Sequence, residues 1–377
     1  MLLLGLVDLV QIEKVIIFLI VLSVLIVLHE YGHFLVARLN GVRVIEFAMG
    51  MGPKIVGWTS PRSGTAYSLR ALPIGGYCQM QGEDGKTTQA EQQREFRQAG
   101  GYADDNFQAK SPLRRLAIIV AGPVANFILC LAILLIAALA FGVQTDKEQA
   151  VVGPMIAGLP AQKAGLQVGD RIVAVNGVAV HGGTQLVNAI HGSLGKSITL
   201  AYERNGSTKT VRLTPAACPK PNPPGQGCIG FTPVPAYGHV GFTEAVRDSF
   251  IEFWNIAQQT VGGIVMLVSH PQQYAGGVHG IVGIGQAATT IQDFGWGMYL
   301  GFAATISFAL GLFNLLPVPA LDGGRAAFII AELFRGRPVD PEKEAIVHIA
   351  GFAALLALIA IVTFHDITNI VAGKGVF

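Results

Sequence analysis

The residues best suited to carry out chemistry lie close together in the segment HEYGH: His29, Glu30 and His33. On a helix, residues four apart share one face, so the two imidazoles can bind a single metal ion. The glutamate beside the first histidine can then act on a water at that metal. The alternative is two packed histidines near an unrelated acid, but unused ionisable groups in an apolar segment cost several kcal/mol. We therefore predict a metal-dependent hydrolytic site.

A third ligand is expected elsewhere, because a hydrolytic zinc site has three protein ligands and one open position. The segment NLLPVPALDGG, residues 314–324, offers Asp322. Pro317 and Pro319 interrupt the helix before it, and irregular backbone at membrane depth is tolerated where it lines a polar cavity. We predict that Asp322 is the third ligand; the alternative is an acid that ends a helix at the cytoplasmic surface.

The elements that position these residues are strongly apolar. The chain has 377 residues, of which 51% are hydrophobic and only 13% charged, against about 25% charged in soluble domains. This composition excludes an ordinary cytosolic enzyme and a disordered chain, and the net charge of +2 gives no reason to expect nucleic acid binding. A membrane span needs about 20 apolar residues. We predict four such spans, within residues 1–40, 113–143, 296–324 and 346–370.

Positive charge indicates how these spans are oriented. Lysine and arginine are frequent in residues 41–112 and 325–345, which predicts that both segments are cytoplasmic and that residues 144–295 face outward. The apolar residues 15–28 rise about 21 Å as a helix, so His29 and His33 lie in the cytoplasmic half of the bilayer. A fifth span at 253–269 would place Asp322 at the outer face. We therefore interpret residues 217–295 as a linker with an interfacial amphipathic helix at 242–269. After that helix, Gly276, Gly277 and Gly283 are expected to form a loop toward the third span.

The outward segment resembles an α+β PDZ domain over residues 148–216. The stretch AGLPAQKAGLQVGDRIVAVNGV, residues 157–178, contains a short helix, a Gly-Asp turn, a strand and an Asn-Gly hairpin turn. Beyond it, Cys218 and Cys228 flank a loop rich in proline and glycine. They form a disulfide if the loop faces an oxidising compartment, or they are two free thiols.

Together, HEYGH, NLLPVPALDGG and a PDZ domain between them resemble the site-2 protease family, in particular bacterial inner-membrane members that cleave anti-sigma factors. Three further segments look like family segments, at residues 47–53 (FAMGMGP), 67–84 (YSLRALPIGGYCQMQGED) and 121–127 (AGPVANF). The chain departs from some members in having one PDZ domain where they have two. The resemblance implies a polytopic α-helical membrane protein with four transmembrane helices, a re-entrant β-hairpin and an extracytoplasmic PDZ domain.

The resemblance also implies roles for individual residues. His29, His33 and Asp322 would hold Zn2+, and Glu30 would be the general base and later the general acid. Asn314 would bind the substrate backbone or the developing oxyanion, unless it is a packing residue.

The glycine-rich stretches before the second span resemble the re-entrant hairpin of the family. By that resemblance Gly50, Gly52, Gly75 and Gly76 would contact the substrate, in a region spanning residues 41–112; the alternative is an ordinary cytoplasmic hairpin. In the second span, Gly122 and Asn126 are expected to serve helix packing.

The function implied is an intramembrane zinc endopeptidase of the bacterial inner membrane, acting in regulated intramembrane proteolysis. Its partners would be the lipid bilayer, a single-span membrane protein substrate and an upstream site-1-type protease that trims that substrate first. Two other classes stay open, a non-catalytic membrane adaptor and a metal transporter. Glu30 argues against the adaptor, which needs no base, and the spans lack the continuous series of ligands that a transporter would use.

Overall fold

The protein was analysed as a computed structural model. It describes residues 9–82, 104–144, 150–155, 158–218, 225–234, 237–271, 280–337, 339 and 341–371. The predicted PDZ start at residue 148 and the predicted loop at Gly276 and Gly277 lie outside these ranges. The chain divides into two compact units. The first contains Met1–Leu134, Phe250–Thr289 and Gly301–Val376, and the second consists almost entirely of Leu135–Ser249 and Thr290–Leu300.

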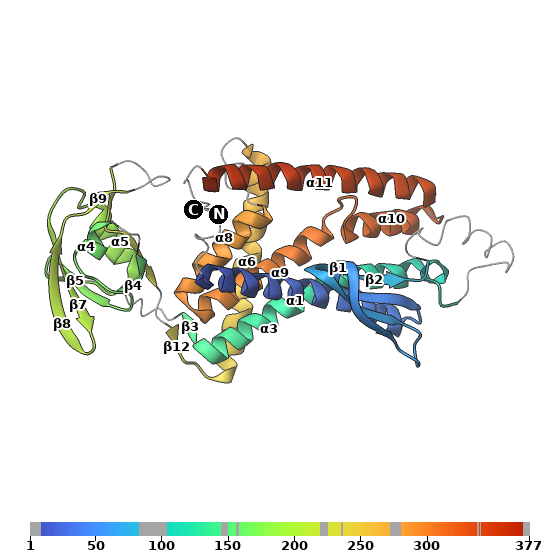
Figure 1. The fold of residues 1–377 in the computed structure, drawn as a ribbon, viewed down its shortest axis with the longest axis horizontal. Coiled ribbons are helices and arrows are strands. Elements are labelled where there is room, and N and C mark those ends of the chain that lie inside the picture. Colours follow the sequence, from blue (N-terminus) through green and yellow to red (C-terminus); the bar gives the residue numbers. More distant parts are fainter. Residues whose placement is uncertain are drawn as a thin grey trace. The chain divides into compact units, whose positions relative to one another are not determined.

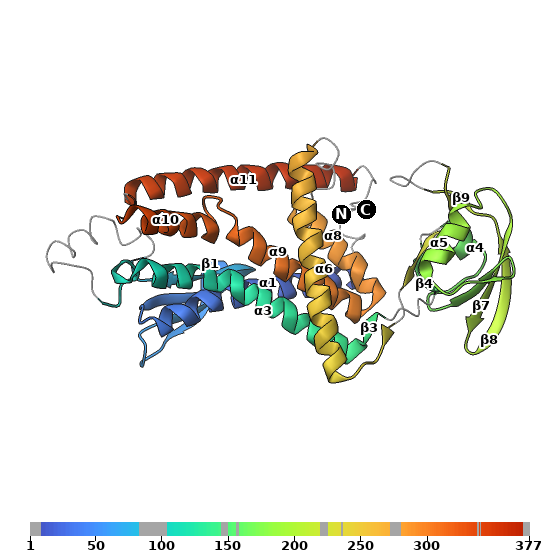
Figure 2. The ribbon, with the colours of Figure 1, turned by 180° about the vertical axis from the view of Figure 1, so that it is seen from behind.

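Four helices in the described residues are long and apolar enough to cross a membrane. They are α1 (Leu9–Leu39), α3 (Pro112–Phe141), α9 (Trp296–Leu315) and α11 (Pro341–Val371). All four extend along roughly the same direction (Figures 1 and 2). Many of their large apolar side chains are exposed, and the apolar stretch of α11 has no buried residue. Such surfaces are unusual in soluble proteins and are typical of contact with lipid. The prediction of four spans is thus confirmed by the length and composition of these helices.

Helix α6 (Phe242–Ser269) extends across the direction of these four helices in both views (Figures 1 and 2). It is not among the four candidate spans. Ile256 of α6 packs in a buried cluster with Cys130 of α3 and Phe308 of α9. This crossing direction is what an interfacial helix needs, so that interpretation stays our prediction for α6.

Two shorter helices complete the first unit, α8 (Ile281–Ile291) and α10 (Asp322–Arg335). The sequence interpretation placed Gly283 in a loop, and this is wrong because Gly283 lies inside α8. Asp366 of α11 accepts hydrogen bonds from the backbone N–H groups of Gly280 and Gly283, each at 2.9 Å. An acid from a distant helix thus caps α8, and a cap of this kind leaves no local sequence signal.

A twisted hairpin of β1 (Val44–Thr59) and β2 (Ala66–Met80) follows α1. The strands fold back on themselves, so that Phe47 lies beside both Tyr67 and Cys78. One side of the hairpin packs into a core with α1, α3 and α10. Several apolar side chains elsewhere on the hairpin are exposed, namely Met51, Ile55, Val56, Trp58, Leu69 and Leu72. A short 3₁₀ turn (Phe107–Ala109) precedes α3.

The second unit is built on a sheet in the order β11-β4-β5-β7-β8, with β6 paired to β5. Its strands are β4 (Ala150–Met155), β5 (Arg171–Val175), β6 (Val178–Ala179), β7 (Ile198–Arg204), β8 (Ser207–Leu213) and β11 (Phe231–Val234). Helices α4 (Pro160–Lys163) and α5 (Gly183–His191) pack against it around an apolar core. The short helix, the strand and the Asn-Gly turn predicted within residues 157–178 are all present, as α4, β5 and the turn at Asn176-Gly177. The predicted end at residue 216 is too early, because β11 pairs with β4 and completes the sheet.

Short strand pairs and one turn complete this unit. β9 (Ala216–Ala217) pairs with β10 (Gly227–Cys228), and β3 (Val143–Gln144) pairs with β12 (Tyr237–Gly238). A 3₁₀ turn, Gln292–Phe294, lies just before α9.

Candidate metal centre

The three predicted metal ligands lie together. Nε2 of His29 is 3.1 Å from Oδ2 of Asp322, Nε2 of His33 is 3.2 Å from the same oxygen, and the two Nε2 atoms are 3.3 Å apart. Zinc binds nitrogen and oxygen at about 2.0–2.1 Å with tetrahedral geometry, which separates neighbouring ligand atoms by about 3.3–3.4 Å. Both histidines are buried and the aspartate is largely so. The donor set and its spacing therefore fit a zinc ion with one position left open.

Asp322 reaches the histidines because the backbone turns sharply after α9. The helix ends at Leu315, and Asp322 is the first residue of α10. A Cβ on Gly323 would lie 2.1 Å from the carbonyl oxygen of Leu316, so only glycine fits there. Ala320 has a positive φ of 78°, which costs an alanine about 1 kcal/mol or more.

This strained turn is held from α11. Nδ1 of His348 accepts the backbone N–H of Ala320 at 3.0 Å. Gly351 makes room for the turn, because a Cβ there would lie 2.3 Å from Cβ of Pro319. Nothing in the local sequence around His348 indicates this contact.

Glu30 lies beside the ligands and under the hairpin. Its Oε2 accepts the backbone N–H of Cys78 at 3.1 Å. A Cβ on Gly76 would lie 3.7 Å from Cγ of Glu30, so this glycine brings the strand close to the acid. A cavity of about 220 Å³ is lined by Glu30 and by two of the three candidate ligands, His29 and Asp322. Its lining residues are Ile26, His29, Glu30, Asn126, Leu310, Asn314, Ala320, Leu321 and Asp322.

Asn314 lines the same cavity, and its Nδ2 donates to the carbonyl oxygen of Leu310 one turn earlier in α9, at 3.0 Å. The four hairpin glycines divide into two groups. Gly76 lies beside Glu30, whereas Gly50, Gly52 and Gly75 have positive φ angles of 83–88° and lie within the strands where their pairing is irregular. The structure thus brings Asn314 and Gly76 to the centre and leaves the other three glycines at bends of the hairpin strands.

A second layer of groups surrounds the histidines. Nδ1 of His33 lies 2.9 Å from the carbonyl oxygen of Ile118, and Nδ1 of His29 lies 3.1 Å from Nδ2 of Asn126. Gly122 packs directly against both rings. The sequence predicted a helix-packing role for Gly122 and Asn126 and gave no sign that either contacts the candidate ligands.

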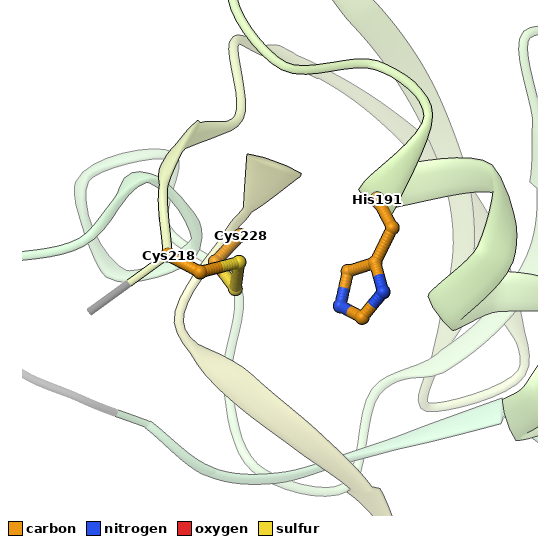
Figure 3. Close-up of side chains that lie close together, drawn as sticks. All are labelled: His191, Cys218 and Cys228. Atoms are coloured by element: carbon orange, nitrogen blue, oxygen red, sulfur yellow. A yellow bond between two sulfur atoms is a disulfide. The ribbon is translucent and has the colours of Figure 1, made fainter. Parts of the chain in front are cut away.

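The second unit contains a separate group of potential ligands. His191, Cys218 and Cys228 have donor atoms within 4.8 Å of one another (Figure 3). The two cysteines form a disulfide with a Cα–Cα distance of 4.8 Å. Of the two alternatives for this pair, the structure contains the disulfide, which leaves His191 without thiolate partners for a metal.

Comparison with known proteins now identifies the family. Residues 17–358 match peptidase family M50. The chain belongs to this family. A zinc metalloprotease of Clostridium acetobutylicum is 34% identical to this M50 chain over 356 residues, covering 94% of it and 97% of the relative. Zinc metalloprotease RasP of Geobacillus kaustophilus is 30% identical over 421 residues, covering 94% and 98%. As an M50 peptidase, the chain is an intramembrane zinc metalloendopeptidase with several membrane-spanning helices.

One similar solved structure covers part of the chain. The PDZ domain of an SdrC-like protein from Listeria monocytogenes is 22% identical, with a TM-score of 0.21, over 24% of this M50 chain and 94% of that chain.

Proposed function

We propose that this protease cuts peptide bonds within the transmembrane segments of single-span membrane proteins, with His29, His33 and Asp322 as zinc ligands. The observation that carries the proposal is the arrangement of these groups: the three candidate ligands form a triangle of zinc dimensions, and two of them, His29 and Asp322, line one small cavity together with Glu30. That space is formed in part by α1 and α9, two helices that are long and apolar enough to cross a membrane. An adaptor would need neither the ligand spacing nor the adjacent acid.

The residues around the cavity have different chemical roles. Bound zinc supplies a Lewis acid that polarises the scissile carbonyl and makes water more acidic. Glu30 removes a proton from the attacking water and then delivers it to the amide nitrogen of the leaving segment. The N–H of Cys78 holds Oε2 of Glu30, which leaves Oε1 to face the water. Asn314 donates its amide to the substrate carbonyl, where negative charge develops.

The hairpin supplies a surface for the substrate. A transmembrane helix satisfies its own backbone hydrogen bonds, so the segment must unwind before hydrolysis, and its freed groups need new partners. The strand at Gly75–Cys78 lies beside Glu30, where an extended segment could pair with it. Exposed Met51, Ile55 and Leu72 fit a hairpin that enters the membrane. Gly50, Gly52, Gly75 and Gly76 would permit the close backbone approach that this pairing needs.

The enzyme would reside in a bacterial inner membrane, with the metal centre toward the cytoplasm and the PDZ-like unit outside. The Cys218–Cys228 disulfide supports this orientation, because disulfides persist in oxidising compartments. Its substrate would be an anti-sigma factor already shortened by a site-1-type protease. The PDZ-like unit would either bind the new C-terminus or exclude substrates that retain bulky outer domains. Equal cleavage of trimmed substrates with free and amidated C-termini would reject the first role.

Cleavage by the purified full chain in vesicles tests the proposal, using a reporter substrate with one membrane span. We compare wild type, Glu30→Gln and the matched control Glu13→Gln, an exposed acid on the same helix. Wild type and the control should cleave and lose activity to a zinc chelator. Glu30→Gln should retain zinc and lose about 10²–10⁴-fold in rate. Equal cleavage by all three would refute the role of Glu30. Bound zinc without cleavage would favour the adaptor, and zinc uptake without cleavage the transporter.

A further inference from the structure

Asn126 occupies an unusual position in the second layer around the metal ligands. Its side chain is completely buried where α1, α3 and α9 meet. The hydroxyl of Ser307 donates to the backbone carbonyl oxygen of Asn126 at 2.9 Å, and this bond does not involve the side-chain amide. Gly311 lets α9 approach this point, because a Cβ there would lie 3.2 Å from Cβ of Asn126. The side-chain amide of Asn126 faces Nδ1 of His29, with Nδ2 at 3.1 Å.

The two histidines have the same requirement at Nδ1. A neutral imidazole that binds metal through Nε2 carries its proton on Nδ1, and metal-binding histidines almost always donate that proton to an acceptor. His33 has such an acceptor in the carbonyl oxygen of Ile118, 2.9 Å from Nδ1. At Nδ1 of His29 the corresponding neighbour is the Asn126 amide.

The amide of Asn126 has two orientations in this space. With Nδ2 toward His29, Oδ1 is buried and has no hydrogen-bond partner among the described residues. That orientation also requires a lone pair on Nδ1, which puts the proton on Nε2 and blocks metal ligation there. Rotation of the amide by half a turn brings Oδ1 to Nδ1–H and frees the Nε2 lone pair.

We propose that Asn126 is a positioning residue for the metal centre, whose Oδ1 accepts the Nδ1 proton of His29 and selects the tautomer that binds zinc through Nε2. The inference rests on the proposed zinc site. This role differs from packing, because it requires a hydrogen-bond acceptor for the Nδ1 proton of His29. A leucine of similar size fills the space without an acceptor, whereas an aspartate retains one.

Zinc affinity of the purified full chain, measured by competition with a chromogenic chelator, tests the proposal. Asn126→Leu should weaken zinc binding about 10–100-fold, the usual effect of losing such an acceptor. Asn126→Asp should restore affinity to within about threefold of wild type. Ser307→Ala is the matched control, because it disturbs the same helix crossing without contacting His29; it should leave affinity unchanged. Cobalt substitution adds a second readout, since a changed His29 ligand should alter the d–d spectrum of Asn126→Leu alone.

Wild-type affinity in a folded Asn126→Leu protein would overturn the proposal, as would equal losses in Asn126→Leu and Ser307→Ala. If the leucine variant does not fold, ¹⁵N spectra of histidine-labelled, zinc-loaded wild type decide instead. They should show His29 protonated at Nδ1 and metallated at Nε2, and the reverse pattern would overturn the proposal. Failure of the wild type to bind zinc would refute the proposed function itself and is thereby distinguished from failure of this inference.

Discussion

Gly122→Ala provides a direct test of the geometry of the metal centre. A methyl group at this position of α3 would lie 2.2 Å from Nε2 of His33 and 2.8 Å from Nε2 of His29. Real Cβ atoms essentially never approach other heavy atoms closer than 3.0 Å, so the overlap with His33 is about 0.8 Å. The added methyl group therefore projects into the space between the two ligand nitrogens.

Neither helix can easily move away from this overlap. A Cβ on Gly32 of α1 would already lie 2.4 Å from the carbonyl oxygen of Ala121, so α1 and α3 are in close contact one residue away. Rotation of the His33 ring would break its hydrogen bond to Ile118, worth about 1 kcal/mol. Zinc sites with four ligands bind with about 10–16 kcal/mol, or about 3 kcal/mol per ligand. Displacement of one histidine should therefore weaken zinc binding about 100-fold.

The assay measures zinc affinity and reporter cleavage for wild type, Gly122→Ala and the control Gly301→Ala. Gly301 lies in α9, where an added Cβ would meet nothing within 4 Å. The control should bind zinc and cleave like wild type, whereas Gly122→Ala should lose both properties. Unchanged zinc affinity in Gly122→Ala would refute the arrangement of α1 against α3 described above.

Three further predictions concern the surroundings of the centre and the second unit. Gly351→Ala should lower the cleavage rate about tenfold or more through displacement of the turn at Pro319, and unchanged steady-state kinetics would contradict this. Burial acts to raise the pKa of Asp170, but hydrogen bonds from Arg204 and a backbone N–H outweigh it and hold the pKa below its usual value. The stabilisation is therefore complete above about pH 4 and is lost as pH falls through the lower folded-state pKa. Hydrogen exchange in β5 should accelerate in that range for wild type, and much less for Asp170→Asn. Cys218→Ser should destabilise the second unit to denaturant by about 2–3 kcal/mol through loss of the disulfide, with zinc content unchanged.

The three candidate ligands could be predicted from the sequence because their signals are local or depend on depth alone. Helical spacing places His29 and His33 on one face, and the length of the apolar segment indicates their level in the bilayer. The same depth argument selects Asp322. The acceptor roles of Ile118 and Asn126 could not be predicted, since they depend on which face of α3 meets α1. The contact between His348 and Ala320 likewise depends on packing of α11 against an irregular turn.

In the second unit, too, features with local sequence signals could be predicted and long-range contacts could not. Alternating apolar residues and the Asn176-Gly177 turn predicted β5 and β6, and the turn has the positive φ angles that this dipeptide favours. The sheet boundary was predicted incorrectly, because β11 lies after a proline-rich segment and pairs with β4, far earlier in the chain. Strand pairing over such a separation depends on tertiary structure, which local patterns do not report.

The pairing of β3 with β12 has a consequence for how this enzyme could evolve. Paired strands lie about 5 Å apart, so the chain leaves α3 and returns toward α6 through a single narrow stem. Everything between Gln144 and Tyr237 is therefore an insertion whose two ends meet. A segment with adjacent ends can be exchanged, duplicated or removed with little change to the host fold. The PDZ-like module can thus diverge while the proteolytic core retains its sequence constraints.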